Sequence, residues 1–202
     1  LHVQLCGPYT DGWSYQENVL PRMHKNQGYD VEIVTTVESY ENGKLVSLSS
    51  GVSSTKEGIP LIRIPYSRMM PLKVARKLRT FVGLDSVLSS FEPQIIFLHE
   101  SQFLDVKYVV EYAKKNSGTR IFVDCHTDFV NSAKNWISKN VLHKIIYKRR
   151  VKKIEPYTTK FFGTLPARSD FLRDVYDIPT KKIDLLPFGA EDDKIDWEGR
   201  VM

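Results

Sequence analysis

The feature that most constrains the fold is a pair of short, nearly uninterrupted apolar segments in the middle of the chain. They read Gln94-Ile-Ile-Phe-Leu-His99 and Arg120-Ile-Phe-Val-Asp124. Strands of this kind are typical of parallel sheets, because helices cover both faces of such a sheet. The segment between them, 103–115, has apolar residues at helical spacing and ends at Asn116-Ser-Gly118. The sequence therefore predicts a strand–helix–strand unit and a parallel sheet.

Further segments of both kinds continue this alternation along the chain. Apolar runs predict additional strands at 1–6, 31–36, 61–65, 158–163 and 183–186. Apolar residues at helical spacing predict helices at 13–27, 71–91, 133–155 and 167–176. Segment 37–60 is irregular, with one or two short strands and a hairpin turn expected at Asn42-Gly43. The alternation predicts an α/β, Rossmann-like three-layer sandwich with a mostly parallel sheet.

The composition is that of a globular protein. Hydrophobic residues make up 42% of the 202 positions, which is enough for a sizeable core. No apolar run reaches the roughly 18 residues of a membrane span, and the chain opens on a strand rather than on a secretory signal. Cys6 and Cys125 lie in apolar runs and predict buried thiols in a reducing compartment. We expect a cytoplasmic domain over 1–190, followed at 191–202 by a charged tail or linker toward a C-terminal domain.

The first strand leads into a loop that carries glycine. Gly7-Pro8 ends the strand, and Gly12 and Trp13 follow just before the first helix. In open α/β sheets, ligands bind outside the carboxyl ends of the strands, near helix N-termini. The loop lacks the G-x-G-x-x-G pattern, so it is no dinucleotide fingerprint. It is either a ligand loop or the first turn that every α/β domain has.

The ends of later strands carry further polar residues. They form the clusters His99-Glu-Ser-Gln102, Asp124-Cys-His-Thr-Asp128 and Thr164-Leu-Pro-Ala-Arg168. His126 lies between two carboxylates, so it could move a proton or hydrogen-bond a bound hydroxyl. The alternative is a loop histidine that caps the next helix. Arg168 could hold a phosphate or carboxylate, or be a surface arginine.

His99, Asp124 and His126 could also be metal ligands. A metal site of that kind usually needs a further histidine or carboxylate at a clear spacing, and none is evident. We therefore expect no metal.

Basic residues gather on two predicted helices. One group is Lys144, Lys148, Arg149, Arg150, Lys152 and Lys153, and the other is Arg68, Lys73, Arg76, Lys77 and Arg79. Such faces are either simply solvated or form a patch that binds an anionic membrane surface. No recognition motif accompanies the charge, so we expect no nucleic acid partner.

With these residues in view, the chain resembles the N-terminal half of GT-B-fold glycosyltransferases of family 4 over nearly its whole length. The order and spacing of several motifs carry the resemblance. They are Gly7-Pro-Tyr-Thr-Asp-Gly-Trp-Ser-Tyr-Gln-Glu-Asn-Val-Leu-Pro21, Gly28-Tyr-Asp-Val-Glu-Ile-Val34, Asp124-Cys-His126, Phe171-Leu-Arg-Asp-Val-Tyr-Asp-Ile-Pro179 and Lys182-Ile-Asp-Leu-Leu-Pro-Phe-Gly-Ala190.

The resemblance implies retaining transfer of a hexose from a nucleotide sugar to a glycan or lipid-linked acceptor, as in polysaccharide biosynthesis, with no cofactor beyond the donor. The N-terminal domain would shape the acceptor side, and a second domain would hold the nucleotide. Carried over, His126 would be the catalytic residue that contacts the transferred sugar. The substrate-binding residues would be Gly12, Trp13, Tyr15, Gln16, His99, Asp124 and Arg168. The basic helices would place the protein peripherally at the inner membrane face.

The sequence departs from the family pattern in two places. Many members have a glycine pair where this loop has Gly12 alone, which puts the contact role of the loop in doubt. The Glu-x7-Glu donor motif belongs to the second domain, which this chain lacks. Glu92 and Glu100 have that spacing, but a strand separates them by about 26 Å, so they cannot share one nucleotide. We therefore expect the chain by itself to be inactive.

Two alternatives stay open. The chain could be the non-catalytic subunit of a split transferase. It could also be a small Rossmann-like hydrolase that uses His99, Asp124 and His126.

Overall fold

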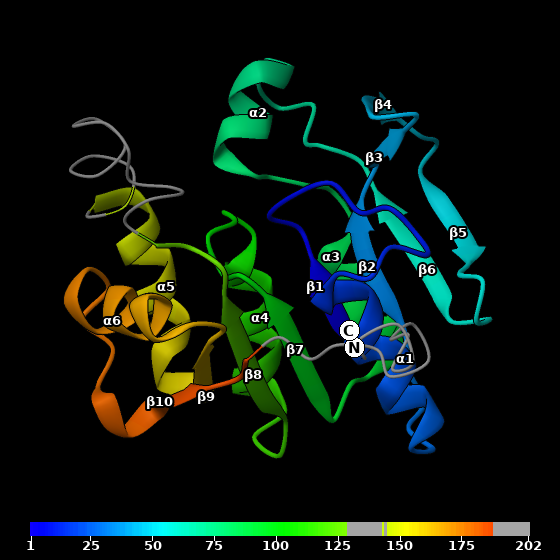
Figure 1. The fold of residues 1–202 in the computed structure, drawn as a ribbon. Helices are drawn as coiled ribbons and strands as arrows, with labels where there is room; N and C mark the ends of the chain where they lie inside the picture. Colours follow the sequence, from blue (N-terminus) through cyan, green and yellow to red (C-terminus); the bar gives the residue numbers. More distant parts are fainter. Residues whose placement is uncertain (129–142, 144, 188–202) are drawn as a thin grey trace, which may run out of the picture.

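The structure, a computed structural model, describes residues 1–128, 143 and 145–187. Its centre is an eight-stranded sheet with the order β10-β9-β8-β7-β1-β2-β6-β5 (Figure 1). The strands are β1 His2–Gln4, β2 Ile33–Thr36, β5 Gly51–Ser54, β6 Pro60–Ile64, β7 Ile95–His99, β8 Arg120–Cys125, β9 Thr158–Gly163 and β10 Ile183–Leu185. All neighbours pair in parallel except β5, which runs antiparallel to β6 at one edge.

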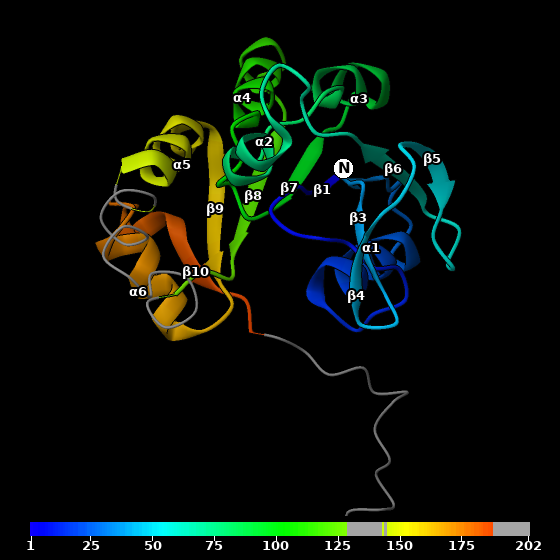
Figure 2. The same cartoon turned by 90° about the horizontal axis from the view of Figure 1, so that it is seen from above.

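Helices lie on both faces of this sheet. The α-helices of the described residues are α1 Gln16–Asn26, α2 Leu72–Leu78, α3 Leu84–Phe91, α4 Val106–Lys115, α5 Lys148–Ile154 and α6 Pro166–Asp174, of which α2 lies beyond the ends of the strands (Figure 1). Figure 2 shows α3, α4 and α5 on one side and α1 and α6 on the other. The predicted α/β, Rossmann-like three-layer sandwich with a mostly parallel sheet is therefore confirmed. The hairpin at Asn42-Gly43 is also present, between β3 Glu38–Glu41 and β4 Lys44–Ser47.

The two faces of the sheet differ in chemistry. Toward α3, α4 and α5, the central strands present fully buried apolar side chains such as Val3, Leu98 and Val123, which join one large core. Residues alternate between the faces of a strand. Their neighbours His2, His99 and Asp124 therefore point to the other face, where they are buried without belonging to that core. The sequence pattern thus brings polar groups together on one side of the sheet.

One predicted helix is interrupted. Residues 71–91 form two helices rather than one, because the chain turns between them at Arg79 and Gly83, both of which have positive φ (51° and 104°). The sequence does not reveal this break, because the apolar residues before and after the turn follow the same helical spacing. Arg79, at the first of these two positions, ends α2 and is half-buried.

The bounds of two other predicted helices differ less from those in the structure. Helix α1 begins at Gln16, so Trp13 belongs to the loop. Of the helix predicted at 133–155, residues 148–154 are confirmed as α5, while 129–142 and 144 lie outside the described residues. The predicted tail at 191–202 also lies outside them, and the division into a domain and a tail stays a prediction.

Two further observations bear on earlier expectations. Glu92 follows α3 just before β7, and Glu100 comes just after β7, so the two lie at opposite ends of one strand. This agrees with the expectation that they cannot bind one nucleotide together. In the described part of the chain, no helix is both long and apolar enough to cross a membrane.

Candidate functional site

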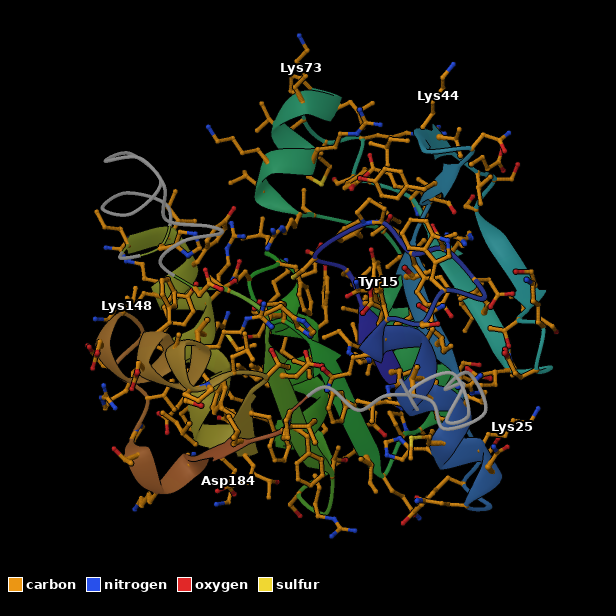
Figure 3. All side chains as sticks on the ribbon, in the orientation of Figure 1. Tyr15, Lys25, Lys44, Lys73, Lys148 and Asp184 are labelled. Carbon is orange, nitrogen blue, oxygen red and sulfur yellow. The ribbon has the colours of Figure 1, made fainter. Side chains whose placement is uncertain are left out.

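A cavity of about 1080 Å³ opens at the carboxyl ends of β1, β7 and β8, beside the start of α1. This is where open α/β sheets hold their ligands. In Figure 3, Tyr15 lies at the start of α1, above the centre of the sheet. The polar or titratable side chains that line the cavity are Gln4, Cys6, Ser14, Tyr15, Gln16, Glu17, Arg79, His99, Glu100, Gln102, His126, Thr127, His143 and Tyr147.

Asp124 organises the floor of this cavity. Its carboxylate is fully buried and accepts a hydrogen bond from His99 Nδ1 at 2.9 Å, while Nε2 of His126 lies 3.3 Å from its other oxygen. The strands produce this contact because His99 of β7 pairs directly with Asp124 of β8. Burial alone would raise the pKa of Asp124, but the two histidines outweigh it and hold that pKa well below its usual range. The carboxylate is therefore charged at neutral pH.

The carboxylate of Asp124 also changes the pKa of His126. Burial works against protonation of its ring, but the hydrogen bond and charge of Asp124 outweigh burial, so the pKa of His126 is raised. With Nε2 turned to Asp124, a protonated ring has Nδ1 as a second N–H donor. His126 can therefore donate a hydrogen bond to a hydroxyl or anionic oxygen at neutral pH more readily than an ordinary histidine.

A chain of histidines extends from Asp124 to α1. His2 Nδ1 lies 3.1 Å from His99 Nε2, and His2 Nε2 lies 2.9 Å from His24 Nδ1. A neutral imidazole donates at one nitrogen and accepts at the other. Because His99 Nδ1 donates to Asp124, its Nε2 accepts from His2, and His2 Nε2 in turn accepts from His24. The carboxylate of Asp124 thus fixes the tautomer of each ring along the chain.

This chain gives the protein a pH-dependent stability. Burial, followed by the charges of His99, the N-terminal amine and His24, lowers the pKa of His2 well below 6.5. A depressed histidine pKa contributes stability that is present above the ordinary value and is lost as pH falls below it. We expect the free energy of unfolding, measured by urea denaturation, to decrease between pH 7 and pH 5, by up to about 1.4 kcal/mol per pH unit from His2.

The variant His2→Phe isolates this effect. It keeps a flat ring against Phe97, with which His2 now stacks at 5.4 Å, and it removes the titrating group. We expect its stability to vary less with pH than that of the unmodified protein over the same range. An equally steep decrease in His2→Phe would show that other groups carry the effect.

Glu100 holds the segment around His126 in place. It adopts a left-handed backbone conformation (φ 68°), which is uncommon for a side chain of its size. Its carboxylate accepts hydrogen bonds from the His126 amide (2.7 Å), the Thr127 hydroxyl (2.8 Å) and the Gln102 amide (3.0 Å). Burial raises its pKa above the usual value. Since both of its oxygens have protein partners, Glu100 is a structural support of the cavity wall.

The structure gathers some of the predicted site residues and separates others. Tyr15, Gln16, His99 and His126 line the cavity, and Asp124 lies directly behind them. Gly12 and Trp13 line a smaller cavity of about 120 Å³ instead, where Trp13 stacks on Tyr40 with ring centroids 5.6 Å apart. Their substrate-binding role stays a prediction, at a place apart from His126.

Arg168 also lies apart from the large cavity. It is a buried residue of α6 whose Nε lies 3.6 Å from the Asp128 carboxylate, and its guanidinium donates a hydrogen bond to the Thr164 hydroxyl. Its position favours a role in holding α6 against the end of β9. A role in binding substrate stays a prediction.

The possible metal ligands are close together. Ligand atoms of His99, Asp124 and His126 lie within 4.8 Å of one another. Both histidines direct a ring nitrogen to the Asp124 carboxylate, so a cation here would have to replace these contacts. Because these contacts already occupy the carboxylate, we assign no metal to the cluster.

Several residues of the cavity, and of the histidine chain behind it, were not foreseen as site residues from the sequence. Arg79 lay in a predicted surface patch, and Tyr147 in a predicted long helix. His2 and His24 had no local signal, since each is a single histidine in an unremarkable strand or helix. Glu100 and Gln102 were part of a strand-end cluster without an assigned role. Only the pairing of distant segments reveals these contacts.

Comparison with known proteins gives a likeness in structure only. The fold is similar to that of a glycosyltransferase from Rickettsia africae ESF-5, with a TM-score of 0.51 and 13% sequence identity. The match covers 95% of this chain but 44% of that one. No family model matches the sequence, and no curated protein matches it. The similarity shows that the two proteins share a fold along nearly all of this chain.

Proposed function

We propose that this chain is the N-terminal, acceptor-side domain of a retaining GT-B glycosyltransferase of family 4. Its substrates would be a nucleotide sugar and a glycan or lipid-linked acceptor. The observation that carries the proposal is His126, which Asp124 holds at the edge of a large cavity at the carboxyl ends of the strands. The glycosyltransferase that shares the fold over 95% of the chain supports it.

In this proposal His126 positions the sugar that is transferred. Its raised pKa favours the protonated ring, so Nδ1 can donate to a sugar hydroxyl while Nε2 faces Asp124. The charge of Asp124 stabilises the protonated ring and fixes its orientation. His99, held by Asp124 and His2, prevents the carboxylate from rotating away. Tyr15 and Gln16, at the start of α1, would contact the acceptor.

The nucleotide would be held by a second domain. The chain spans less than half the length of the glycosyltransferase that it resembles in fold. The test is turnover of nucleotide sugars by the protein isolated from its source cell, with its intact mass measured first. A mass above 23.3 kDa by a domain of about 150 residues, together with retained anomeric configuration in the product, supports the proposal. Absence of transfer by a protein of that larger mass contradicts it.

We further propose that the loop and helix around α2 attach the protein to the cytoplasmic face of a membrane. The structure changes the composition of the predicted basic patches. Arg79 lines the cavity and Arg150 is buried, while Arg76 pairs with Glu38 at 2.8 Å and Lys148 with Asp177 at 2.5 Å.

The basic residues that remain exposed around α2 lie beside an apolar side chain. Arg68, Lys73 and Lys77 are exposed, and Met69 is 94% exposed. Figure 3 shows Lys73 extending outward from α2. Exposed basic and apolar groups together are what an anionic lipid surface attracts.

The double variant Lys73→Gln/Lys77→Gln tests this attachment. Each lysine near an anionic surface contributes about 1 kcal/mol, so co-sedimentation with anionic liposomes is expected to weaken about tenfold or more. Lys114→Gln/Lys115→Gln, which removes two exposed lysines at the end of α4, is the matched control and should bind like the unmodified protein. Equal binding of neutral and anionic liposomes would exclude the electrostatic attachment.

A further inference from the structure

Two arginines meet at one wall of the large cavity. The Cζ atoms of Arg79 and Arg150 each lie 5.4 Å from the centre of the Tyr147 ring. Arg150 and Tyr147 are both buried, and Arg79 lines the cavity together with Tyr147 and Gln102. Among the residues that the structure describes, neither guanidinium forms an ion pair with a carboxylate. Two positive charges thus share a partly desolvated place, and no carboxylate of the described residues contacts either of them directly.

The carboxylate of Glu100 reaches Arg79 only through Gln102. Arg79 Nη1 donates to Gln102 Oε1 at 2.9 Å, and Gln102 Nε2 donates to Glu100 at 3.0 Å, so the amide lies between the two charges. Both oxygens of Glu100 already accept hydrogen bonds, from Gln102, Thr127 and the His126 amide. A guanidinium has five N–H donors. Those of Arg79 reach Gln102 and the Cys6 thiol, which leaves donors for a further acceptor.

The position of Arg79 is fixed rather than free. Its backbone is in the left-handed region (φ 51°), and its carbonyl accepts from the Leu104 amide at 3.0 Å. Arg150 donates hydrogen bonds to two backbone carbonyls, that of Leu78, which precedes Arg79, at 2.9 Å and that of Gln102 at 2.6 Å. Arg150 therefore acts as a positioning residue, which holds both Arg79 and its partner Gln102, and adds a second positive charge behind them.

We propose that Arg79 is the anchor of an anion subsite, which binds a phosphate or carboxylate group of the molecule that fills this cavity. A guanidinium binds either group through two parallel hydrogen bonds, and burial strengthens them. The subsite adjoins His126 through Gln102 and Glu100. This inference rests on the proposed function. Under it, the acceptor is a sugar or lipid-linked sugar that carries an anionic group.

The carboxylate of Glu17 also lines the cavity, but from α1. Its charge opposes an anion at that wall, whereas the other carboxylate that lines the cavity, Glu100, is bound by Gln102, Thr127 and the His126 amide. An acceptor with its anionic group at Arg79 and its neutral hydroxyls toward α1 fits this distribution of charge. An acceptor bound in the reverse direction would put two negative groups together.

The test is a titration of the 202-residue chain, followed through the Nε–Hε signals of its arginines by nuclear magnetic resonance. The probes are inorganic phosphate, glucuronate and, as a neutral reference, glucose. We expect the Arg79 signal to shift and saturate with phosphate or glucuronate, and not with glucose. Saturation with phosphate alone identifies a phosphate-bearing acceptor, and saturation with glucuronate alone identifies an acidic sugar.

Variants locate the binding. Arg79→Gln should weaken binding of the favoured anion at least about tenfold, because a charge-assisted pair is lost. Arg79→Lys should retain part of it, since the charge stays but the planar fork does not. The control Arg149→Gln removes an exposed arginine next to Arg150 and should bind normally.

The subsite is refuted if neither anion moves the Arg79 signal, or if Arg79→Gln binds as tightly as the control. These outcomes do not depend on transferase activity. Anion binding at Arg79 in a protein that transfers no sugar would leave the subsite standing and remove only the proposed function.

Discussion

Replacing His126 with alanine is expected, under the proposed function, to lower the kcat/KM of sugar transfer at least about 100-fold, the usual effect of losing a positioned acid–base group. The residue is held by Asp124 at 3.3 Å and lines the cavity. Alanine removes both the donor at Nδ1 and the charge that Asp124 stabilises. Initial rates at several acceptor concentrations measure the effect.

A second variant separates catalysis from folding. In Asp124→Asn the ring of His126 stays, but the negative charge that raises its pKa is gone. We expect a similar loss of activity at neutral pH, with part of the activity recovered as pH falls, because an acidic medium can protonate His126 again. Asp184→Asn, at an exposed ion pair with Lys160, is the matched control and should be fully active. Normal activity in His126→Ala would remove this histidine from the mechanism.

Replacing Gly163 with alanine is expected to destabilise the protein by about 3 kcal/mol or more, or to prevent folding. Gly163 ends β9, where α6 approaches it so closely that a Cβ would lie 2.6 Å from the Ser169 nitrogen and 3.0 Å from its Cα. These are backbone atoms of a helix, so relief requires α6 to move away from the sheet. Urea denaturation followed by circular dichroism measures the loss.

Gly118→Ala provides the comparison. A Cβ at Gly118 would have no atom within 4 Å, so this change should leave the urea midpoint nearly unaltered. If Gly163→Ala were as stable as Gly118→Ala, α6 would have to lie farther from β9 than the structure places it. The pair of variants thus tests the packing of this helix without reference to function.

The fold class could be predicted because it depends on local patterns. The apolar runs at 94–99 and 120–124 become β7 and β8, with bounds that differ by a residue. The Asn42-Gly43 turn gave its hairpin. The prediction of a single helix over 71–91 was wrong. The spacing of the apolar residues continues across the left-handed turn at Arg79, so the spacing does not reveal the break. The antiparallel edge strand β5 had no strong signal in its serine-rich sequence.

The candidate site was predictable where it follows the ends of strands. His99, Asp124 and His126 were placed together by the rule that parallel strands end at one edge, and the register of β7 with β8 brings them into contact. Arg79, His2 and His24 could not be placed there, because each reaches its partners through a different element. The sequence lists these residues without showing which of them meet.

Hydrophobic periodicity along the sequence alone determined that this protein is an α/β domain with polar groups at the strand ends, because periodicity is a property of neighbouring residues. Only the tertiary structure decided that Asp124 would lie between two histidines, and that Arg79 would face a cavity rather than solvent. Those outcomes depend on strand register and on one backbone turn. A shift of a single residue in the register would send the same strand side chains to the opposite face of the sheet.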